Sequence, residues 1–181
     1  MYLPQFQAAG LALAESGLIT GASGNLSIHL KDRLIITRHG SVLSSLTGSD
    51  LIETGIYTDD SATSLASWEL PVHRAVYMGT KALCIVHAHP PHAVMLSLAD
   101  EKVEIPGGVA VVGTSTGIVP GVLASEIARE LGKHPLVMVK GHGSFAIGKT
   151  LAEACDLTLA FEEDCRRICL RLSIPVKRLL E

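Results

Sequence analysis

The amino-acid sequence predicts a mixed α/β fold in which a β-sheet is covered by helices. Three observations carry this prediction. Several segments place apolar residues at helical spacing and begin or end with capping residues. Other segments are short apolar runs rich in β-branched residues, which is typical of buried strands. Two further segments alternate apolar and polar residues around a short turn. This pattern predicts a β-hairpin in addition to the alternating strands and helices.

The first half of the chain supplies both kinds of element. A helix is expected over residues 3–16, because the segment LPQFQAAGLALAES is followed by Gly17. Residues 25–30 and 33–38 alternate around a Lys-Asp turn and predict the hairpin. The segment TGSDLIET, residues 47–54, has the character of another helix start.

The second half continues the alternation. A helix is expected to begin between Glu69 and Val72, because Pro71 stands early and helix-forming residues follow it. A long final helix is expected after Thr150, which forms a capping-box pattern with Glu153. Buried strands are expected at residues 82–86, 107–113 and 135–140.

The composition suits one globular domain spanning residues 1–181, with 48% hydrophobic and 18% charged residues. The net charge of -3, without a basic block, argues against nucleic acid or an anionic membrane as the partner. The longest uncharged run, residues 105–125, is interrupted by five glycines and two prolines, so it is a poor membrane span.

The cellular compartment is predicted from the N-terminus and the cysteines. The N-terminus lacks the positive region of a secretory signal. The four cysteines contain no Cys-x-x-Cys pair, so we expect reduced, mostly buried thiols in a cytoplasmic protein.

Histidines at two strand ends suggest a metal site. Side chains alternate across a strand, so His87 and His89 point the same way, and two prolines then end the strand. His142 follows another buried strand and stands between glycines, which makes it the best third ligand. Three imidazoles with one open position are typical of catalytic zinc. The alternative is three hydrogen-bonded polar histidines at strand ends.

Glu69 is the leading candidate for an acid or base. It lies beside Trp68, and apolar surroundings would raise its pKa toward the working pH. Alternatively, it is an ordinary first-turn glutamate favoured by the helix dipole. The turn TGASGNLSI could hold an anion on its backbone N–H groups, aided by Asn25 and Ser27, or it could be a tight turn requiring positive φ. His73 could line a cleft or face solvent.

Most of the chain resembles the class II aldolase/adducin family, whose best-known members are fuculose-phosphate aldolases. The resemblance rests on the order and spacing of five segments: GLITGASGNLSIHL, RLIITRHG, ASWELPVHRAVY, CIVHAHPPHAV and VKGHGSFAIGKTLAEAC. It implies a three-layer domain, with a central, mostly antiparallel sheet flanked by helices. It also implies a homotetramer with active sites between neighbouring subunits.

The resemblance implies roles for individual residues. His87, His89 and His142 correspond to the zinc ligands, and Glu69 corresponds to the acid/base glutamate. Mn²⁺, Fe²⁺ or Co²⁺ could bind the same three imidazoles. The positions that hold phosphate in the sugar-phosphate enzymes correspond to Gly24, Asn25, His39, Gly40, Ser67 and Trp68.

The implied reaction is the cleavage of a small ketose phosphate to a ketone phosphate and an aldehyde through a metal-stabilised enediolate. Two departures bear on the phosphate. His39-Gly40 replaces the usual Thr-Gly, and Ser67-Trp68-Glu69 replaces Ser-Ser-Glu. A third concerns the proton donor, because the segment EIPGGVAVVGTSTG lacks the tyrosine that aldolases of this family often use there.

These departures favour an alternative reaction on the same metal site. That alternative is the decarboxylation of a hydroxy or aromatic acid, or the dehydration of a sugar phosphate. A non-catalytic interaction module is a third hypothesis, because the adducin head resembles this fold without its metal site. The complete histidine set and Glu69 argue against this module.

Overall fold

The structure is a computed structural model that describes residues 1–99, 105–113 and 120–173. These residues form one seven-stranded sheet with the order β3-β2-β1-β4-β7-β6-β5. Neighbouring strands run antiparallel, except that β5 runs parallel to β6. The strands are β1 (Asn25–Leu30), β2 (Arg33–Thr37), β3 (Leu51–Gly55), β4 (Cys84–Ala88), β5 (Ala110–Val112), β6 (Leu136–Val139) and β7 (Gly143–Gly148).

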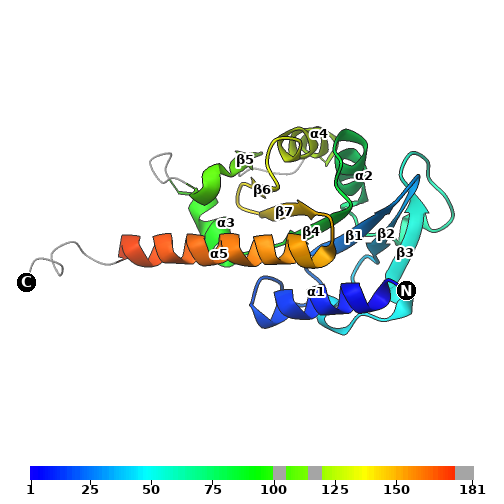
Figure 1. Cartoon of the computed structure of the whole chain (residues 1–181), viewed down its shortest axis with the longest axis horizontal. Helices are drawn as coiled ribbons and strands as arrows, with labels where there is room; N and C mark the ends of the chain where they lie inside the picture. Colours follow the sequence, from blue (N-terminus) through cyan, green and yellow to red (C-terminus); the bar gives the residue numbers. More distant parts are fainter. Residues whose placement is uncertain (100–104, 114–119, 174–181) are drawn as a thin grey trace, which may run out of the picture.

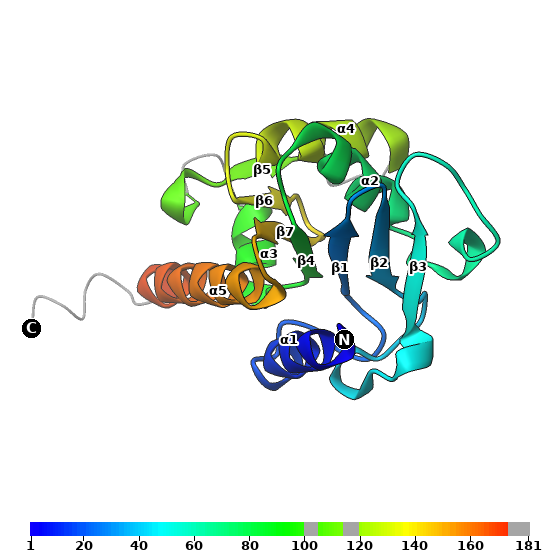
Figure 2. The same cartoon turned by 45° about the vertical axis from the view of Figure 1, so that its right-hand side comes forward.

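Helices cover both faces of the sheet, so the expected three-layer arrangement is confirmed. Helices α2 and α4 lie together on one face, and α1, α3 and α5 lie on the other (Figures 1 and 2). Among the described helices, none is both long enough and apolar enough to cross a membrane. The helices are α1 (Leu3–Glu15), α2 (Leu70–Gly79), α3 (Pro91–Ser97), α4 (Pro120–Leu131) and α5 (Leu151–Ser173).

Strand alternation divides the apolar side chains into two cores. In β4, Val86 packs in the core beneath α1, α3 and α5, whereas Ile85 packs in the core beneath α2 and α4. His87 therefore points to the α2 side of the sheet, like Ile85. The α2 face is the face that receives the candidate site.

The structure confirms the predicted hairpin, the first helix, the helix beginning near Pro71 and the three buried strands. Part of the uncharged run 105–125 lies outside the described residues. All four cysteines are free thiols, and three of them are buried.

The helix predicted at residues 47–54 is wrong. A single 3₁₀ turn, Gly48–Asp50, takes up the helix-start signal, because Asp50 accepts hydrogen bonds from the Thr47 N–H and hydroxyl. The chain then enters β3, which pairs with β2. Pairing with a neighbouring strand therefore outweighs the local signal in this segment.

Two further differences are local. The capping box at α5 is only half formed, because Glu153 N–H donates to the Thr150 hydroxyl but the Glu153 carboxylate accepts from Lys149 N–H. Strand β7 was not predicted. Its sequence GSFAIG contains glycine at both ends, which weakens the strand pattern in the sequence alone.

Candidate active site

Two antiparallel strands bring the three predicted histidines together. His87 lies near the end of β4, His89 follows that strand, and His142 immediately precedes β7. Because Ala88 pairs with Ser144, the end of β4 lies beside the start of β7. One ring nitrogen of each histidine lies within 4.8 Å of those of the other two.

The hydrogen bonds of His87 prepare its ring for a cation. Its Nδ1 lies 2.9 Å from the Ser144 carbonyl, so Nδ1–H donates there and Nε2 faces the cluster. That Nε2 lies only 3.0 Å from Nε2 of His89. Burial lowers the pKa of His87 and, with the neighbouring imidazoles, lowers the pKa of His89 to about 4. Three facing imidazole rings are the donor set that Zn²⁺ needs, so these residues fit the metal.

Glu69 completes the cluster from the start of α2. Its Oε1 lies 3.1 Å from His142 Nε2, and its Oε2 lies 3.2 Å from His87 Nε2. Its side chain makes no capping bond to α2, so it is not an ordinary first-turn glutamate. Asn25 Nδ2 donates to Glu69 Oε2 over 2.7 Å.

The expected rise in the Glu69 pKa is not found. Burial alone would raise it, but the rings of His87 and His142 and the Asn25 amide favour the charged carboxylate. Together they hold the pKa of Glu69 well below its ordinary value. The sequence showed the neighbouring Trp68, but it did not show the polar groups that the fold brings to the carboxylate.

Gly24 lets β1 approach β4, the strand that carries His87. Gly24 has φ +76°, and a Cβ atom there would lie 2.8 Å from the His87 carbonyl oxygen. The next residue, Asn25, pairs with His87 in the sheet. The glycine-rich turn therefore places the Asn25 side chain within hydrogen-bonding distance of Glu69.

The remaining predicted binding residues lie at the rim. The rings of His39 and Trp68 stack with centroids 3.9 Å apart, and Trp68 is 80% exposed. Gly40 follows in a turn with φ +76°, and the Ser67 hydroxyl accepts from Glu69 N–H over 3.3 Å. Ser67 and Trp68 thus adjoin Glu69, whereas the ring of His39 contacts Trp68 rather than the histidine cluster.

An apolar cavity of about 280 Å³ adjoins the cluster. Glu69 and His142 form part of its wall, so it is continuous with the candidate metal centre. The rest of the wall is apolar, apart from the indole N–H of Trp68. Those lining residues are Trp68, Pro71, Val72, Leu123, Ile127, Val139 and Phe145.

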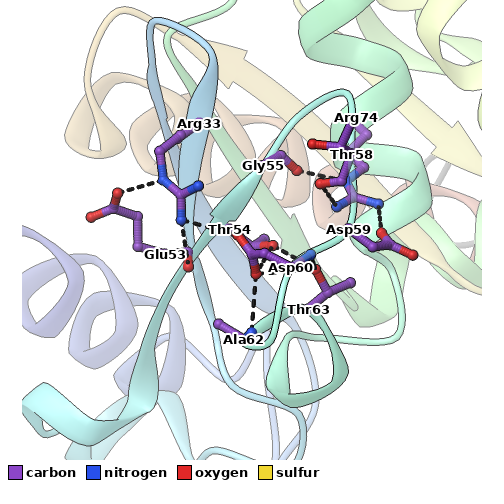
Figure 3. A network of polar contacts seen from close by, with 10 residues as sticks. All are labelled: Arg33, Glu53, Thr54, Gly55, Thr58, Asp59, Asp60, Ala62, Thr63 and Arg74. Atoms are coloured by element: carbon purple, nitrogen blue, oxygen red, sulfur yellow. Dashed lines mark hydrogen bonds and ion pairs between the residues drawn. The ribbon is translucent and has the colours of Figure 1, made fainter.

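An exposed polar network holds the loop between β3 and Glu69 (Figure 3). Arg33 of β2 bonds to Glu53 and Asp60, and Asp60 accepts three further hydrogen bonds, from the hydroxyls of Thr54 and Thr63 and from Ala62 N–H. Arg74 of α2 ties the same loop to the helix through Gly55, Thr58 and Asp59. We call this set the arginine network. It fixes the path along which the chain enters the segment 67–69.

Sequence reasoning missed the roles of His73 and Tyr77. His73 is fully buried and bonds through both ring nitrogens, to Ser27 Oγ and to Asn25 Oδ1, each over 2.6 Å. Tyr77 bonds to the same Ser27 hydroxyl over 2.6 Å. A signal was present, since Glu69, His73 and Tyr77 are spaced by four and so share one face of α2.

Comparison with known proteins matches this chain to one family, and the similar proteins have several different activities. A family model described as Class II Aldolase and Adducin N-terminal domain matches residues 5–169. The crystal structure of L-fuculose-1-phosphate aldolase from Thermus thermophilus is similar with a TM-score of 0.84 and 31% identity. The similarity covers 93% of this chain and 94% of that chain.

Two relatives have different activities. A probable bifunctional methylthioribose-1-phosphate isomerase/methylthioribulose-1-phosphate dehydratase of Nocardia farcinica is 27% identical over 84% of this chain. This chain spans only 32% of that protein. A 3,4-dihydroxyphthalate decarboxylase of Terrabacter sp. is 28% identical over 78% of this chain and 69% of that protein.

Proposed function

Because the chain belongs to the class II aldolase and adducin family, we propose that it is a metal-dependent lyase of the aldolase type. The observation that carries the proposal is the convergence of His87, His89 and His142 on one point, with the Glu69 carboxylate beside them. Its proposed substrate is a small ketose phosphate, cleaved to a ketone phosphate and an aldehyde.

The three histidines would hold Zn²⁺, or another divalent transition metal. Such an ion supplies a Lewis acid that stabilises negative charge on a substrate oxygen. Glu69 would move the proton, because its two oxygens lie next to the histidine nitrogens and its carboxylate is charged. Gly24, Asn25, Gly40 and Ser67 would hold the phosphate, with His39 and Trp68 at the rim.

Metal content is the first test. We expect about one zinc ion per chain in protein purified without added metal, because three imidazoles are a typical protein ligand set of catalytic zinc. His89→Ala should lose the metal, whereas His134→Ala, outside the cluster, should retain it. A wild-type protein that folds but binds no metal would point to the non-catalytic interaction module instead.

The reaction is tested next on the zinc-loaded protein. Aldehyde formation from fuculose 1-phosphate, followed with a coupled alcohol dehydrogenase, is the expected result. Glu69→Gln should retain the metal but lose roughly 100-fold or more in turnover, because the proton acceptor is removed. Stoichiometric zinc without cleavage of any ketose phosphate would contradict the aldolase proposal.

The apolar cavity favours a second candidate, the decarboxylation of a hydroxy or aromatic acid. A polyhydroxylated chain in this cavity would leave hydroxyls unpaired, at about 1–3 kcal/mol each. An aromatic ring would instead bury apolar surface against Ile127, Val139 and Phe145. Release of carbon dioxide from a dihydroxybenzoic or dihydroxyphthalic acid, without aldehyde formation from sugar phosphates, would select this candidate. Loss of water from a sugar phosphate would select the dehydratase form.

A further inference from the structure

A chain of four short hydrogen bonds leads from the interior of the protein to Glu69. Tyr77 Oη lies 2.6 Å from Ser27 Oγ, which lies 2.6 Å from His73 Nδ1. His73 Nε2 lies 2.6 Å from Asn25 Oδ1, and Asn25 Nδ2 lies 2.7 Å from Glu69 Oε2. All members except Glu69 are buried. We call this set the buried chain.

The orientation of the Asn25 amide, with Nδ2 on Glu69 and Oδ1 on His73, gives the direction of every bond in the chain. A carboxylate only accepts hydrogen bonds, so the Asn25 amide turns its NH₂ group toward Glu69 and its oxygen toward His73. His73 must then donate through Nε2–H, which leaves Nδ1 to accept from the Ser27 hydroxyl. Ser27 in turn accepts from Tyr77.

The protonation states agree with this direction. Burial lowers the pKa of His73 to about 3, so its ring is neutral and can carry only one N–H. Burial also raises the pKa of Tyr77, so its hydroxyl keeps the proton that it donates. In the Nε2–H tautomer of this neutral ring, reversal of the Asn25 amide would place two acceptors against each other at Glu69 and two donors against each other at His73.

We propose that His73 is a positioning residue that locks the Asn25 amide with its N–H groups directed at the Glu69 carboxylate. The locked amide holds Glu69 Oε2 beside His87, where the proposed proton transfer takes place. This inference depends on the proposed function only for the role of Glu69 in turnover. The arrangement of the amide itself is independent of the metal and of the substrate.

The first test observes the amide directly by NMR in the metal-free protein. Long-range ¹H–¹⁵N spectra should show His73 in the Nε2–H tautomer. The two Asn25 side-chain N–H signals should be sharp and protected from exchange. His73→Gln keeps an N–H donor and should preserve the Asn25 signals, whereas His73→Leu has no donor and should broaden or shift them.

The outcomes are separable from those of the lyase assignment, because this measurement needs neither metal nor substrate. An Nδ1–H tautomer, or Asn25 signals unchanged in His73→Leu, would overturn the positioning role. Should His73→Leu fail to fold, Ser27→Ala replaces it. Loss of the donor to Nδ1 should then give mixed His73 tautomers and broadened Asn25 signals, whereas an unchanged tautomer and sharp signals would contradict the proposal.

The second test separates kcat from KM once a substrate is identified. We expect His73→Leu to lower kcat roughly 10- to 100-fold with little change in KM or zinc content, and His73→Gln to stay within about threefold of wild type. Leu13→Ala, in α1 and away from the site, provides a destabilised control that should leave kcat unchanged. Equal loss of kcat in both His73 variants would overturn the positioning role, because the variant that keeps an N–H donor would then be no better than the variant without one.

Discussion

Two polar networks lead to the segment that carries Glu69, and they differ in their contact with water. The buried chain runs from Tyr77 through Ser27, His73 and Asn25, and its members other than Glu69 are neutral. The ion pairs of the arginine network lie at the surface, whereas its Thr54 is buried, and the network holds the loop that precedes the same segment (Figure 3). Both connect the strands β1–β3 to α2 or to the loop before it.

The difference shows that polar contacts of similar length can contribute different amounts to the free energy of unfolding. In the exposed network, water and salt can replace a lost partner, so each ion pair contributes little. In the buried chain nothing replaces a lost partner, so a deletion leaves a polar group unpaired. The buried chain should therefore control stability and the geometry of Glu69, while the arginine network should modulate the loop.

The largest effect is expected for His73→Leu. This change leaves the Asn25 oxygen and the Ser27 hydroxyl without their partner in the interior. Two unpaired buried groups should lower the free energy of unfolding by about 2–4 kcal/mol, measured by urea denaturation. A loss no larger than that caused by removing the exposed ion pairs of Arg33 would contradict the dominance of the buried chain.

The next effect concerns pH. The folded-state pKa of His73, about 3, lies below the ordinary value of 6.5. Between these values the unfolded chain binds more protons, so this stability is present above about pH 6.5 and is lost as the pH falls. From about pH 7.5 to about pH 5, wild type should lose about 2 kcal/mol more than His73→Gln, which cannot titrate there. An equal loss in both proteins would show that His73 is not held neutral.

A smaller effect is expected at the far end of the buried chain. Tyr77→Phe removes one buried hydroxyl that donates to Ser27, while the ring remains packed. We expect a loss of about 1 kcal/mol in the free energy of unfolding, since Ser27 keeps its bond to His73. A Ser27→Ala, Tyr77→Phe double-mutant cycle should show coupling between the two hydroxyls, and strictly additive losses would argue against their bond.

The smallest effect is expected in the arginine network. Arg33→Gln removes exposed ion pairs with Glu53 and Asp60. The loss of stability should be less than that of Tyr77→Phe, and it should shrink further at about 1 M NaCl, because salt screens exposed charges. A larger loss than that of Tyr77→Phe, or one that salt does not change, would reverse the comparison between the two networks.

Much of the site could be predicted from local sequence. The spacing of His87 and His89 at a strand end depends only on strand alternation, and the position of Glu69 depends on the helix start near Pro71. The helix predicted at residues 47–54 failed, because pairing of β3 with β2 is a long-range contact that a local signal does not contain. Strand β7 was missed for a different reason, because glycine at both of its ends weakens the local strand pattern.

The sequence by itself determined which residue types are available: three histidines at strand ends, one carboxylate before a helix, and most of the helices and strands. Tertiary structure alone decided how they meet. Pairing of β4 with β7 places His142 beside His87, and pairing of β1 with β4 brings Asn25 to Glu69. Burial then lowers the pKa of His73, and the polar neighbours lower that of Glu69. Hydrogen-bond direction and pKa depend on groups that are distant in sequence but adjacent in space, and for that reason only the folded chain specifies them.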